Sequence, residues 1–470
     1  MQIIDTINDV LWTYILVGVL LGAGLYFTIL LRGVQFTMLG EMMRTLVRSG
    51  RKHDDAADRA LPRGRTISSF QAFAVSLAAR VGTGNIAGVA IAIALGGPGA
   101  VFWMWVVAIL GASNAFVEST LAQLFKVRGE HSYRGGPAYY IYLGLKSRAY
   151  AVTFAVLITV TFGLAFNSVQ SNTIAIALNG TFGFEPLWTG VGLTAATLFI
   201  IFGGIQRIAR LNQIVVPAMA LLYILLALWV IVTNIGSFPY VMAMIVENAF
   251  GIDQVMGGGV GMAMIMGIKR GLFSNEAGEG STPNAAATAA VSHPVKQGLI
   301  QTLGVYVDTL LVCTATAFII LCSGVFDCGL TGIELTQYAL ATQVGEYASV
   351  FVAIAVLLFA YTSIIANYYY GETNLYFIRR SKRLIFVFRL CVGAVVMTGT
   401  LLTLDTVWAM ADITMALMTL CNIIAILLLG KYARRALVDY RRQLKEGKDP
   451  QYSADTIPEA DTPCWPNSLS

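Results

Sequence analysis

Long apolar runs alternate with short polar segments along almost the whole chain. Eleven of these runs approach the roughly 20 residues that an α-helix needs to cross the hydrocarbon core of a bilayer. The pattern therefore predicts an all-α, polytopic membrane protein with eleven transmembrane helices. The runs lie at about residues 10–31, 70–95, 100–125, 150–178, 187–203, 211–233, 257–290, 299–322, 349–370, 384–402 and 407–430.

Lysine and arginine residues gather in alternate connections between the runs. The connections 32–68, 126–149 and 371–383 hold eight, five and four of them, and the stretch 431–470 holds seven. The turn with Arg207 and Arg210 holds two and the turn at Lys296 holds one, while the connections that alternate with these basic ones hold none. Because cytoplasmic loops carry the excess of positive charge, the distribution predicts an inner-membrane protein with its N-terminus outside and its C-terminus in the cytoplasm.

Two stretches outside the runs have patterns of their own. Residues 446–470 are rich in aspartate, proline and serine, a composition that predicts a disordered cytoplasmic tail. Residues 237–253 are amphipathic and only moderately apolar. We therefore expect a helix on the outer surface there, rather than a twelfth span.

The seventh run is interrupted by the sequence GLFSNEAGEGSTPN, residues 271–284. Polar side chains stand where an ordinary span carries leucine and valine. Glycine and proline weaken a helix by roughly 1 and 3 kcal/mol per residue relative to alanine, and this stretch holds three glycines and one proline. Non-helical backbone is stable in a membrane only where protein buries it or where it lines a wet cavity. The stretch therefore predicts a broken helix at a binding site.

The second run has a similar interruption, in which Gly82, Thr83, Gly84 and Asn85 are adjacent. Small residues alone are also typical of a helix-packing face, but the hydroxyl and amide groups here add polarity that packing does not need. The two breaks lie five spans apart, so the second five-helix unit enters the membrane from the opposite side. This arrangement predicts two inverted repeats with a site between them at the midplane.

The breaks divide the chain into five parts. They are an extra N-terminal helix with a basic loop (1–68), the first repeat (69–234), an outer connection (235–256), the second repeat (257–430) and the tail (431–470).

Composition agrees with a membrane protein and disfavours an enzyme. The chain is 57% hydrophobic and 12% charged, whereas soluble domains carry about 25% charged residues. The three histidines and six cysteines show no metal-site spacing, and no HExxH, GxSxG or P-loop motif is present. We expect no catalytic residue, no enzymatic cofactor and no nucleic-acid partner.

Broken helices expose free backbone groups, and these could hold a zwitterion. Free N–H groups at one half-helix end suit a carboxylate, and free C=O groups at the other suit an ammonium. We expect the carboxylate near Thr83, Gly84 and Asn85, and the ammonium near residues of the second break. The side chains of Ser274 and Asn275 could equally cap the helix ends. The second-break residues are Phe273, Ser274 and Asn275.

Three further polar side chains lie in the middle of apolar runs. Gln170 can donate and accept hydrogen bonds, so it could contact a ligand or join two helices. Thr362 and Ser363 could bond to their own helix. Their uncharged oxygens would also suit a weakly held, readily released Na⁺.

Charged side chains inside the runs are expensive unless they are paired or wet. Glu276 and Glu279 are expected to pair with Lys269 and Arg270, or one of them could carry a proton or act in gating. Asp308 has the same two interpretations. Glu118 has them too, but it lies toward the cytoplasmic end of its run, where it could also simply reach the surface.

Four motifs resemble those of the alanine or glycine:cation symporter family of prokaryotes. They are GTGN at 82–85, GGPGAVFWMW at 96–105, RGGPAYY at 134–140 and RGLFSNEAGEGSTPNAAATA at 270–289. The resemblance covers the chain from the first span to residue 430. It implies a fold similar to the leucine transporter, a 5+5 inverted repeat with one added N-terminal helix. It also implies Na⁺-coupled uptake of alanine or glycine, with the D-isomer in some members.

The resemblance also assigns roles to residues. The GTGN motif, the FSN of the second break and Gln170 would grip the amino acid. The coupling Na⁺ would be held by the carbonyls of Ala78 and Val81 and by the hydroxyls of Thr362 and Ser363. Ala79 stands where members of the wider superfamily that use two Na⁺ ions often carry asparagine, which puts a second ion in doubt. The carboxylate of Glu279 departs from the family pattern, which more often has an uncharged residue there.

We therefore expect an inner-membrane symporter that imports a small neutral amino acid with Na⁺ by alternating access. An H⁺-coupled carrier that uses Glu276, Glu279 or Asp308 is the first alternative. A channel, or an amino-acid sensor that does not transport, is the second. The expected partners are the amino acid, Na⁺ and the lipid bilayer, and the oligomeric state is left open, with a monomer as one possibility.

Overall fold

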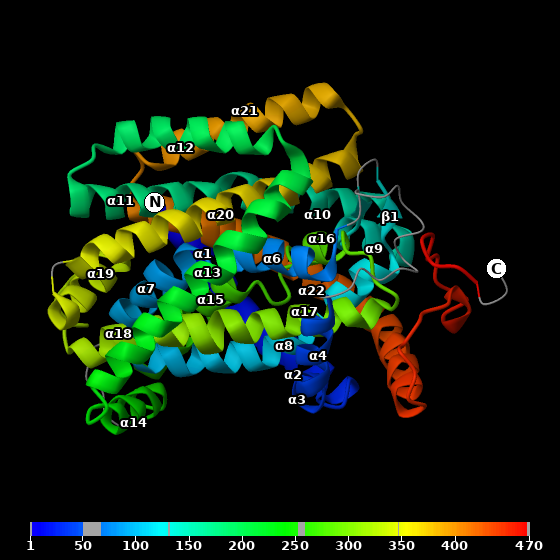
Figure 1. The fold of residues 1–470 in the computed structure, drawn as a ribbon, viewed down its shortest axis with the longest axis horizontal. Coiled ribbons are helices and arrows are strands. Elements are labelled where there is room, and N and C mark those ends of the chain that lie inside the picture. The colour runs from blue at the N-terminus through cyan, green and yellow to red at the C-terminus, as the bar shows by residue number, and fades with distance from the viewer. Residues whose placement is uncertain (1, 50–66, 130–131, 252–258, 346, 468–470) are drawn as a thin grey trace.

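A computed structural model describes residues 2–49, 67–129, 132–251, 259–345 and 347–467. Within these residues the protein is a bundle of helices that run along one long axis (Figure 1). Seven of them are long and apolar enough to cross a membrane, and the number is eight if one bent pair counts as a single span. The protein is thus a multi-pass helical membrane protein.

Helices occupy all eleven of the apolar ranges, while the number of spans and the inverted repeat stay predictions. The helix Gly332–Val344 is an addition that the apolar pattern did not predict, and Phe238–Ala249 lies within the stretch where a surface helix was expected. The helices are α1 (Gln2–Asp9), α2 (Val17–Leu30), α3 (Val34–Thr37), α4 (Leu39–Ser49), α6 (Ser69–Arg80), α7 (Val89–Gly96), α8 (Gly99–Leu124), α9 (Pro137–Leu145), α10 (Arg148–Val160), α11 (Asn167–Phe182), α12 (Pro186–Ile201), α13 (Gly204–Thr233), α14 (Phe238–Ala249), α15 (Gly259–Asn275), α16 (Pro283–Ala286), α17 (Pro294–Val305), α18 (Thr314–Ser323), α19 (Gly332–Val344), α20 (Tyr347–Ile378), α21 (Lys382–Gly399) and α22 (Leu404–Lys445).

Short segments of other structure join or interrupt these helices. Several spans contain a π-helical turn, a feature that is frequent at functional sites because it redirects side chains within a helix. The remaining elements are the π-helical η1 (Val10–Leu16), η2 (Gly84–Gly88), η3 (Thr161–Phe166) and η4 (Tyr306–Cys313), the 3₁₀ helix η5 (Ala454–Thr456), and the antiparallel strands β1 (Val127–Arg128) and β2 (Tyr133–Arg134).

The two ends of the bundle carry different connections. Strand β1, helix α9 and the C-terminus lie at the right-hand end of Figure 1, and α14 and α19 lie toward the left-hand end. The basic connection that holds β1 and α9 thus lies at the right-hand end, and the connections that hold α14 and α19, which carry no lysine or arginine, lie toward the left-hand end. The predicted orientation requires this separation, although the side that faces the cytoplasm stays a prediction.

The first predicted break is confirmed. Helix α6 ends at Arg80, and the chain turns through 47° before the helical segment that starts at Gly84. Val81 has φ −77° and ψ 89°, which no α-helix accommodates. The break between α6 and η2 therefore overlaps the start of the expected GTGN motif, while Gly84 and Asn85 already lie in η2.

The second predicted break is confirmed as well. Helix α15 ends at Asn275, and the chain is non-helical until α16 starts at Pro283. Glu276, Gly278 and Gly280 all have positive φ, at 56°, 96° and 84°. Glycine adopts this conformation freely, so the two glycines allow the loop to form, whereas Glu276 adopts it at a steric cost.

The expectation of a disordered tail is wrong for the residues that the structure describes. Tyr452 and Ile457 are buried, and the backbone N–H of Tyr452 donates to the carbonyl of Ser292 at 2.9 Å. The Trp465 indole donates to the carbonyl of Gln123 at 2.9 Å. Composition predicted disorder because these few apolar anchors are outnumbered by polar residues, but each anchor finds a partner on the helix bundle.

The docked tail leads to a testable expectation. In Trp465→Ala the tail should lose roughly 1–2 kcal/mol of docking free energy, because a half-buried aromatic ring no longer packs. Hydrogen exchange at the Tyr452 amide should then be roughly tenfold faster or more, since local opening controls exchange. Trp188 is 67% exposed in the structure, so Trp188→Ala is the matched control. Unchanged exchange at Tyr452 in the Trp465 variant would show that the tail does not depend on this anchor.

Candidate functional site

The two helix breaks meet in the middle of the bundle. A Cβ placed on Gly84 of the first break would lie 3.0 Å from the Phe273 ring and 3.2 Å from the Cα of Ser274. Only glycine allows so close an approach, because any larger residue would push the two breaks apart. The structure thus brings together the two stretches that the sequence singled out.

Free backbone donors of the first break are satisfied by two amide side chains. The Gly82 N–H donates to Asn85 Oδ1 at 2.9 Å, and the Thr83 N–H donates to Gln170 Oε1 at 3.1 Å. Asn85 therefore caps the break, a role that the sequence did not suggest for this residue. Gln170 lies in α11, which follows the π-helical segment η3 directly. Its side-chain oxygen occupies a position where a substrate carboxylate oxygen would also find a donor.

Asp308 joins both breaks to η4. Its carboxylate accepts hydrogen bonds from Asn85 Nδ2 at 2.6 Å, from Ser274 Oγ at 2.8 Å and from Thr309 Oγ1 at 2.8 Å. All four residues are buried. The sequence suggested only a mid-span carboxylate here, whereas the structure places it at the junction of the two broken helices.

Oxygen atoms from α6 and α20 gather beside the first break. Ser363 Oγ lies 2.7 Å from the carbonyl oxygen of Ala78 and 3.4 Å from that of Val81. The hydroxyl of Thr362 donates to the carbonyl of Phe359 in its own helix at 2.8 Å. Ser363 Oγ also lies 2.9 Å from the same Phe359 carbonyl. The structure thus brings three of the four expected Na⁺ ligands together, and both hydroxyls make the local bond that was the alternative.

Several buried polar atoms around the breaks have no hydrogen-bond partner within the described residues. They include Thr83 Oγ1, Asn275 Nδ2 and Trp408 Nε1. A buried polar group without a partner costs roughly 1–3 kcal/mol, so a ligand that supplied partners to these three atoms would be stabilised.

An aromatic wall closes this site on one side. The ring of Phe273 lies 4.5 Å from that of Phe166 and 4.5 Å from that of Trp408, measured between centroids. Trp408 was not among the residues that the sequence singled out. It stands in an apolar run as an ordinary large residue, so no local signal distinguishes it from packing.

The expected pairing of Lys269 and Arg270 with the glutamates of the second break is wrong. Both cations bind Asp412 of α22 instead, with N–O distances of 2.8 Å for Lys269 and 2.6 Å for Arg270. Helix α15 ends at Asn275, so the two glutamates leave the helix before they could lie on the same face as the cations. The ion pairs therefore connect α15 to α22, close to Trp408.

The glutamates of the second break have other environments. Glu276 accepts hydrogen bonds from the hydroxyls of Ser281 at 2.5 Å and Thr282 at 3.2 Å. Both carboxylate oxygens of Glu279 are buried without a hydrogen-bond partner among the described residues. Glu276 thus stabilises the loop, while the role of Glu279 is not explained by any contact.

Glu118 of α8 is fully buried, so the expectation that it reaches the surface is wrong. Its two oxygens accept hydrogen bonds from the N–H groups of Gly278 at 3.3 Å and Gly280 at 3.1 Å. Asn422 Nδ2 donates to it at 2.8 Å. The carboxylate thus holds the non-helical loop of the second break, a role that sequence spacing could not reveal because the partners lie about 160 residues apart.

Comparison with known proteins places the chain in one family. The model of the sodium:alanine symporter family matches residues 1–454. The probable sodium/glutamine symporter GlnT of Bacillus subtilis is 52% identical over 469 residues, which cover 99% of this chain and 96% of that protein. The amino-acid carrier protein AlsT of the same organism is 52% identical and covers 97% of this chain and 96% of its own length. The sodium/proton-dependent alanine carrier protein of Bacillus sp. PS3 is 42% identical, with coverage of 85% and 94%.

Solved structures show a shared fold at low sequence similarity. A manganese transporter of Eremococcus coleocola superposes with a TM-score of 0.57 at 13% identity, over 84% of this chain and 92% of that one. This likeness shows a transporter-type helical fold and nothing about the cargo. The family match over nearly the whole length and the identities above 50% are decisive: the chain belongs to the sodium:alanine symporter family.

Proposed function

We propose that the protein is a secondary active symporter that imports a small neutral amino acid together with Na⁺. The observation that carries the proposal is the meeting of the two broken helices at Gly84 and Phe273. Buried polar atoms of the breaks and of Trp408 have no hydrogen-bond partner among the described residues, namely Thr83 Oγ1, Asn275 Nδ2 and Trp408 Nε1. An amino acid offers both donors and acceptors to such groups. Family membership and relatives named as amino-acid carriers support the same function.

The proposed substrate contacts follow the two breaks. The substrate carboxylate would meet the N–H end of the first break at Thr83, Gly84 and Asn85, where Gln170 now supplies the acceptor. The ammonium would meet the C-terminal carbonyls of α15. Binding thus requires Gln170 to exchange its backbone partner for the substrate, which couples α11 to occupancy of the site. The α15 carbonyls that would meet the ammonium belong to Phe273, Ser274 and Asn275.

Size favours alanine or glycine among neutral amino acids. The half-helix ends approach so closely at Gly84 that a single added Cβ would crowd Phe273, and Phe166 and Trp408 flank that ring. The relatives carry names that range from glutamine to alanine, so membership in the family does not select the substrate. The proposed preference for alanine or glycine therefore rests on the close packing of the aromatic wall formed by Phe166, Phe273 and Trp408.

Sodium is the proposed coupling ion. The carbonyl oxygens of Ala78 and Val81 and the hydroxyl oxygens of Thr362 and Ser363 are uncharged, which suits an ion that must bind and be released in each cycle. Ser363 Oγ already lies within hydrogen-bonding distance of both carbonyls. A Na⁺ ion there would connect α6 to α20 and would favour the conformation in which these helices are close.

Alternating access would use the two breaks as hinges. In the proposed topology of eleven spans, residues 69–234 and 257–430 form inverted repeats around the site, and the extra N-terminal span lies outside them. The N-terminus would lie outside and the basic loops in the cytoplasm of a cell with an inner membrane. Movement of one half against the other then exposes the site to each side in turn.

A proton is the second candidate coupling ion, and the environment of Glu279 favours it. This carboxylate is buried without a hydrogen-bond partner among the described residues, and such a charge is costly inside a membrane protein. A bound proton would remove the charge. Two relatives carry sodium/proton in their names.

The decisive experiment measures uptake of labelled alanine and glycine into proteoliposomes under an imposed Na⁺ gradient and, separately, an imposed pH gradient. Under the Na⁺ gradient the wild type should accumulate substrate, and Thr362→Ala/Ser363→Ala should lose this uptake roughly tenfold or more. Glu279→Gln should retain it. Labelled glutamine, tested in parallel, measures the substrate range.

Two results would contradict the proposal. Accumulation driven by the pH gradient alone and abolished in Glu279→Gln would identify the proton as the coupling ion. Uptake by the double variant at the wild-type rate would remove the Na⁺ site from Thr362 and Ser363. Counterflow of pre-loaded alanine, measured without any gradient, separates loss of coupling from loss of substrate binding.

A further inference from the structure

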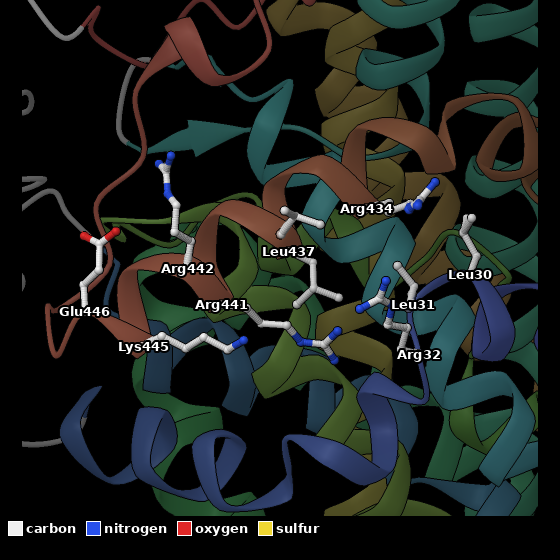
Figure 2. Close-up of a pocket in the computed structure, with 10 residues that line it drawn as sticks. Leu30, Leu31, Arg32, Arg434, Leu437, Arg441, Arg442, Lys445 and Glu446 are labelled. Carbon is white, nitrogen blue, oxygen red and sulfur yellow. The ribbon is translucent and has the colours of Figure 1, made fainter.

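A pocket separate from the proposed transport site lies where the first span meets the C-terminal extension of α22. Its volume is about 630 Å³, and the end of α2 and the last four turns of α22 line it (Figure 2). Five of its ten lining residues are basic and one is acidic, so its field attracts anions. The basic residues are Arg32, Arg434, Arg441, Arg442 and Lys445.

Most of these cations lack a counter-charge. Arg442 pairs with Asp439, but within the part of the chain that the structure describes, no carboxylate pairs with Arg32, Arg434 or Arg441. Arg441 donates only to the Thr37 hydroxyl, at 3.1 Å. Burial and the nearby charge of Arg32 lower the pKa of the Arg441 guanidinium. The guanidinium groups of Arg32 and Arg441 repel each other, and an anion bound between them would attract both.

Backbone geometry places one of these cations at the rim. The chain leaves α2 through two consecutive residues of left-handed conformation, Arg32 with φ 54° and Gly33 with φ 59°. Arginine adopts this conformation at a cost of roughly 1 kcal/mol. The turn brings Arg32 across the mouth of the pocket toward Arg441, as Figure 2 shows.

The opposite wall of the pocket is apolar and continues toward the bilayer. Leu31 and Leu437 are each 1% exposed and pack beneath the cations. Val438 lines the pocket and is 60% exposed, and Leu427, eleven residues earlier on nearly the same face of α22, is 39% exposed. On α2, Tyr26 lies one turn before the lining residue Leu30 and is 47% exposed. A molecule with a charged head and apolar chains would match both parts, whereas a free anion would use only the basic part.

We propose that this pocket binds the head group of an anionic phospholipid, with its phosphate between Arg32, Arg434 and Arg441 and its acyl chains along α2 and α22. Arginine forks recognise phosphate oxygens in pairs, and basic pockets between spans at a membrane surface are typical lipid sites. The docked part of the tail is not the occupant: Ser453, Asp455 and Thr456 line a neighbouring pocket with Arg434 and Arg442, and none of them lines this one. The inference goes beyond the transport function and requires only that the protein lies in a bilayer.

The test measures lipid binding to the purified, full-length protein by native mass spectrometry. Phosphatidylglycerol and cardiolipin are titrated against phosphatidylcholine as the neutral lipid. Removal of two arginines should weaken binding of the anionic lipids by roughly 10- to 30-fold, since each basic residue near the surface contributes about one tenfold step or slightly less. The variant is Arg434→Gln/Arg441→Gln, and Arg434→Gln alone serves if the double variant does not fold.

The control variant has the same charge change elsewhere on the same basic end of the bundle. Arg379 lies in the connection between α20 and α21, and Arg383 lies in the first turn of α21. Neither lines this pocket, so Arg379→Gln/Arg383→Gln should bind anionic lipid like the wild type. If both variants lost anionic lipid binding equally, the lipid would be held by the positive charge of the surface in general, and the proposed pocket would be wrong. Inorganic phosphate is the last arm: if it raises the melting temperature as much as phosphatidylglycerol does, the site binds a free anion and not a lipid.

Discussion

Gly82→Ala should abolish Na⁺-driven amino-acid uptake while the protein still folds. An added Cβ would lie 2.5 Å from Ser363 Oγ and 3.0 Å from Gln170 Oε1. One methyl group thus disturbs a proposed Na⁺ ligand and a proposed substrate contact together. The backbone itself tolerates alanine, because Gly82 does not have a positive φ. The expected effect is a loss of uptake of roughly tenfold or more, at a stability cost of about 1–3 kcal/mol for overpacking.

The control for this prediction is Gly192→Ala in α12. No atom lies within 4 Å of a Cβ placed there, so uptake and melting temperature should stay near the wild-type values. A second variant separates the two contacts: in Gly82→Ala/Ser363→Ala the closest clash is removed, and stability should recover while Na⁺ dependence stays lost. Normal uptake by Gly82→Ala would show that the first break opens more widely than the structure indicates.

Sequence alone predicted the two breaks because their causes are local. Glycines, a proline and polar side chains inside an apolar run weaken the helix wherever the run is placed, so the break at 81–83 and the loop after Asn275 followed from composition. The positions of Ala78, Val81 and Ser363 relative to one another were proposed through resemblance. Their close approach in the structure depends on how α6 packs against α20.

Pairings across the bundle could not be predicted from the sequence, because they depend on packing between distant segments. Lys269 and Arg270 were expected to pair with the glutamates that follow them, yet Asp412, more than 140 residues later, is their partner. Trp408 gave no signal, since a tryptophan in an apolar run is most often core. For the tail, the sequence predicted too little structure, because a few anchors such as Trp465 hold an otherwise polar segment against the bundle.

The same limit applies to Glu118, for which the structure supports the second large prediction. The loop between α15 and α16 offers backbone N–H groups that no helix satisfies, and Glu118 accepts two of them, from Gly278 and Gly280. Asn422 of α22 donates to the same carboxylate and also to the carbonyl of Gly278. One side chain of α8 therefore fixes the loop on which the proposed substrate contacts of the second break depend.

Glu118→Ala should cost roughly 2–6 kcal/mol, because each of two buried backbone donors left without an acceptor costs about 1–3 kcal/mol. That is a large fraction of the 5–15 kcal/mol typical of a folded domain, so both the melting temperature and uptake should fall steeply. Glu118→Gln keeps one acceptor oxygen and should be milder in stability, yet its NH₂ group faces a donor and should still distort the loop. Glu334 is an exposed carboxylate at the start of α19, and Glu334→Gln is the matched control.

Hydrogen exchange at residues 276–282 distinguishes this role from general destabilisation. If Glu118 holds the loop, exchange at Gly278 and Gly280 should accelerate in Glu118→Gln under conditions where α8 and α22 stay protected. Uniform acceleration across the bundle would assign Glu118 to overall stability instead. Wild-type exchange and uptake in Glu118→Ala would contradict the role altogether. We expect loss of the loop conformation to cause loss of transport, because the second break can bind a substrate only while its non-helical backbone keeps one conformation.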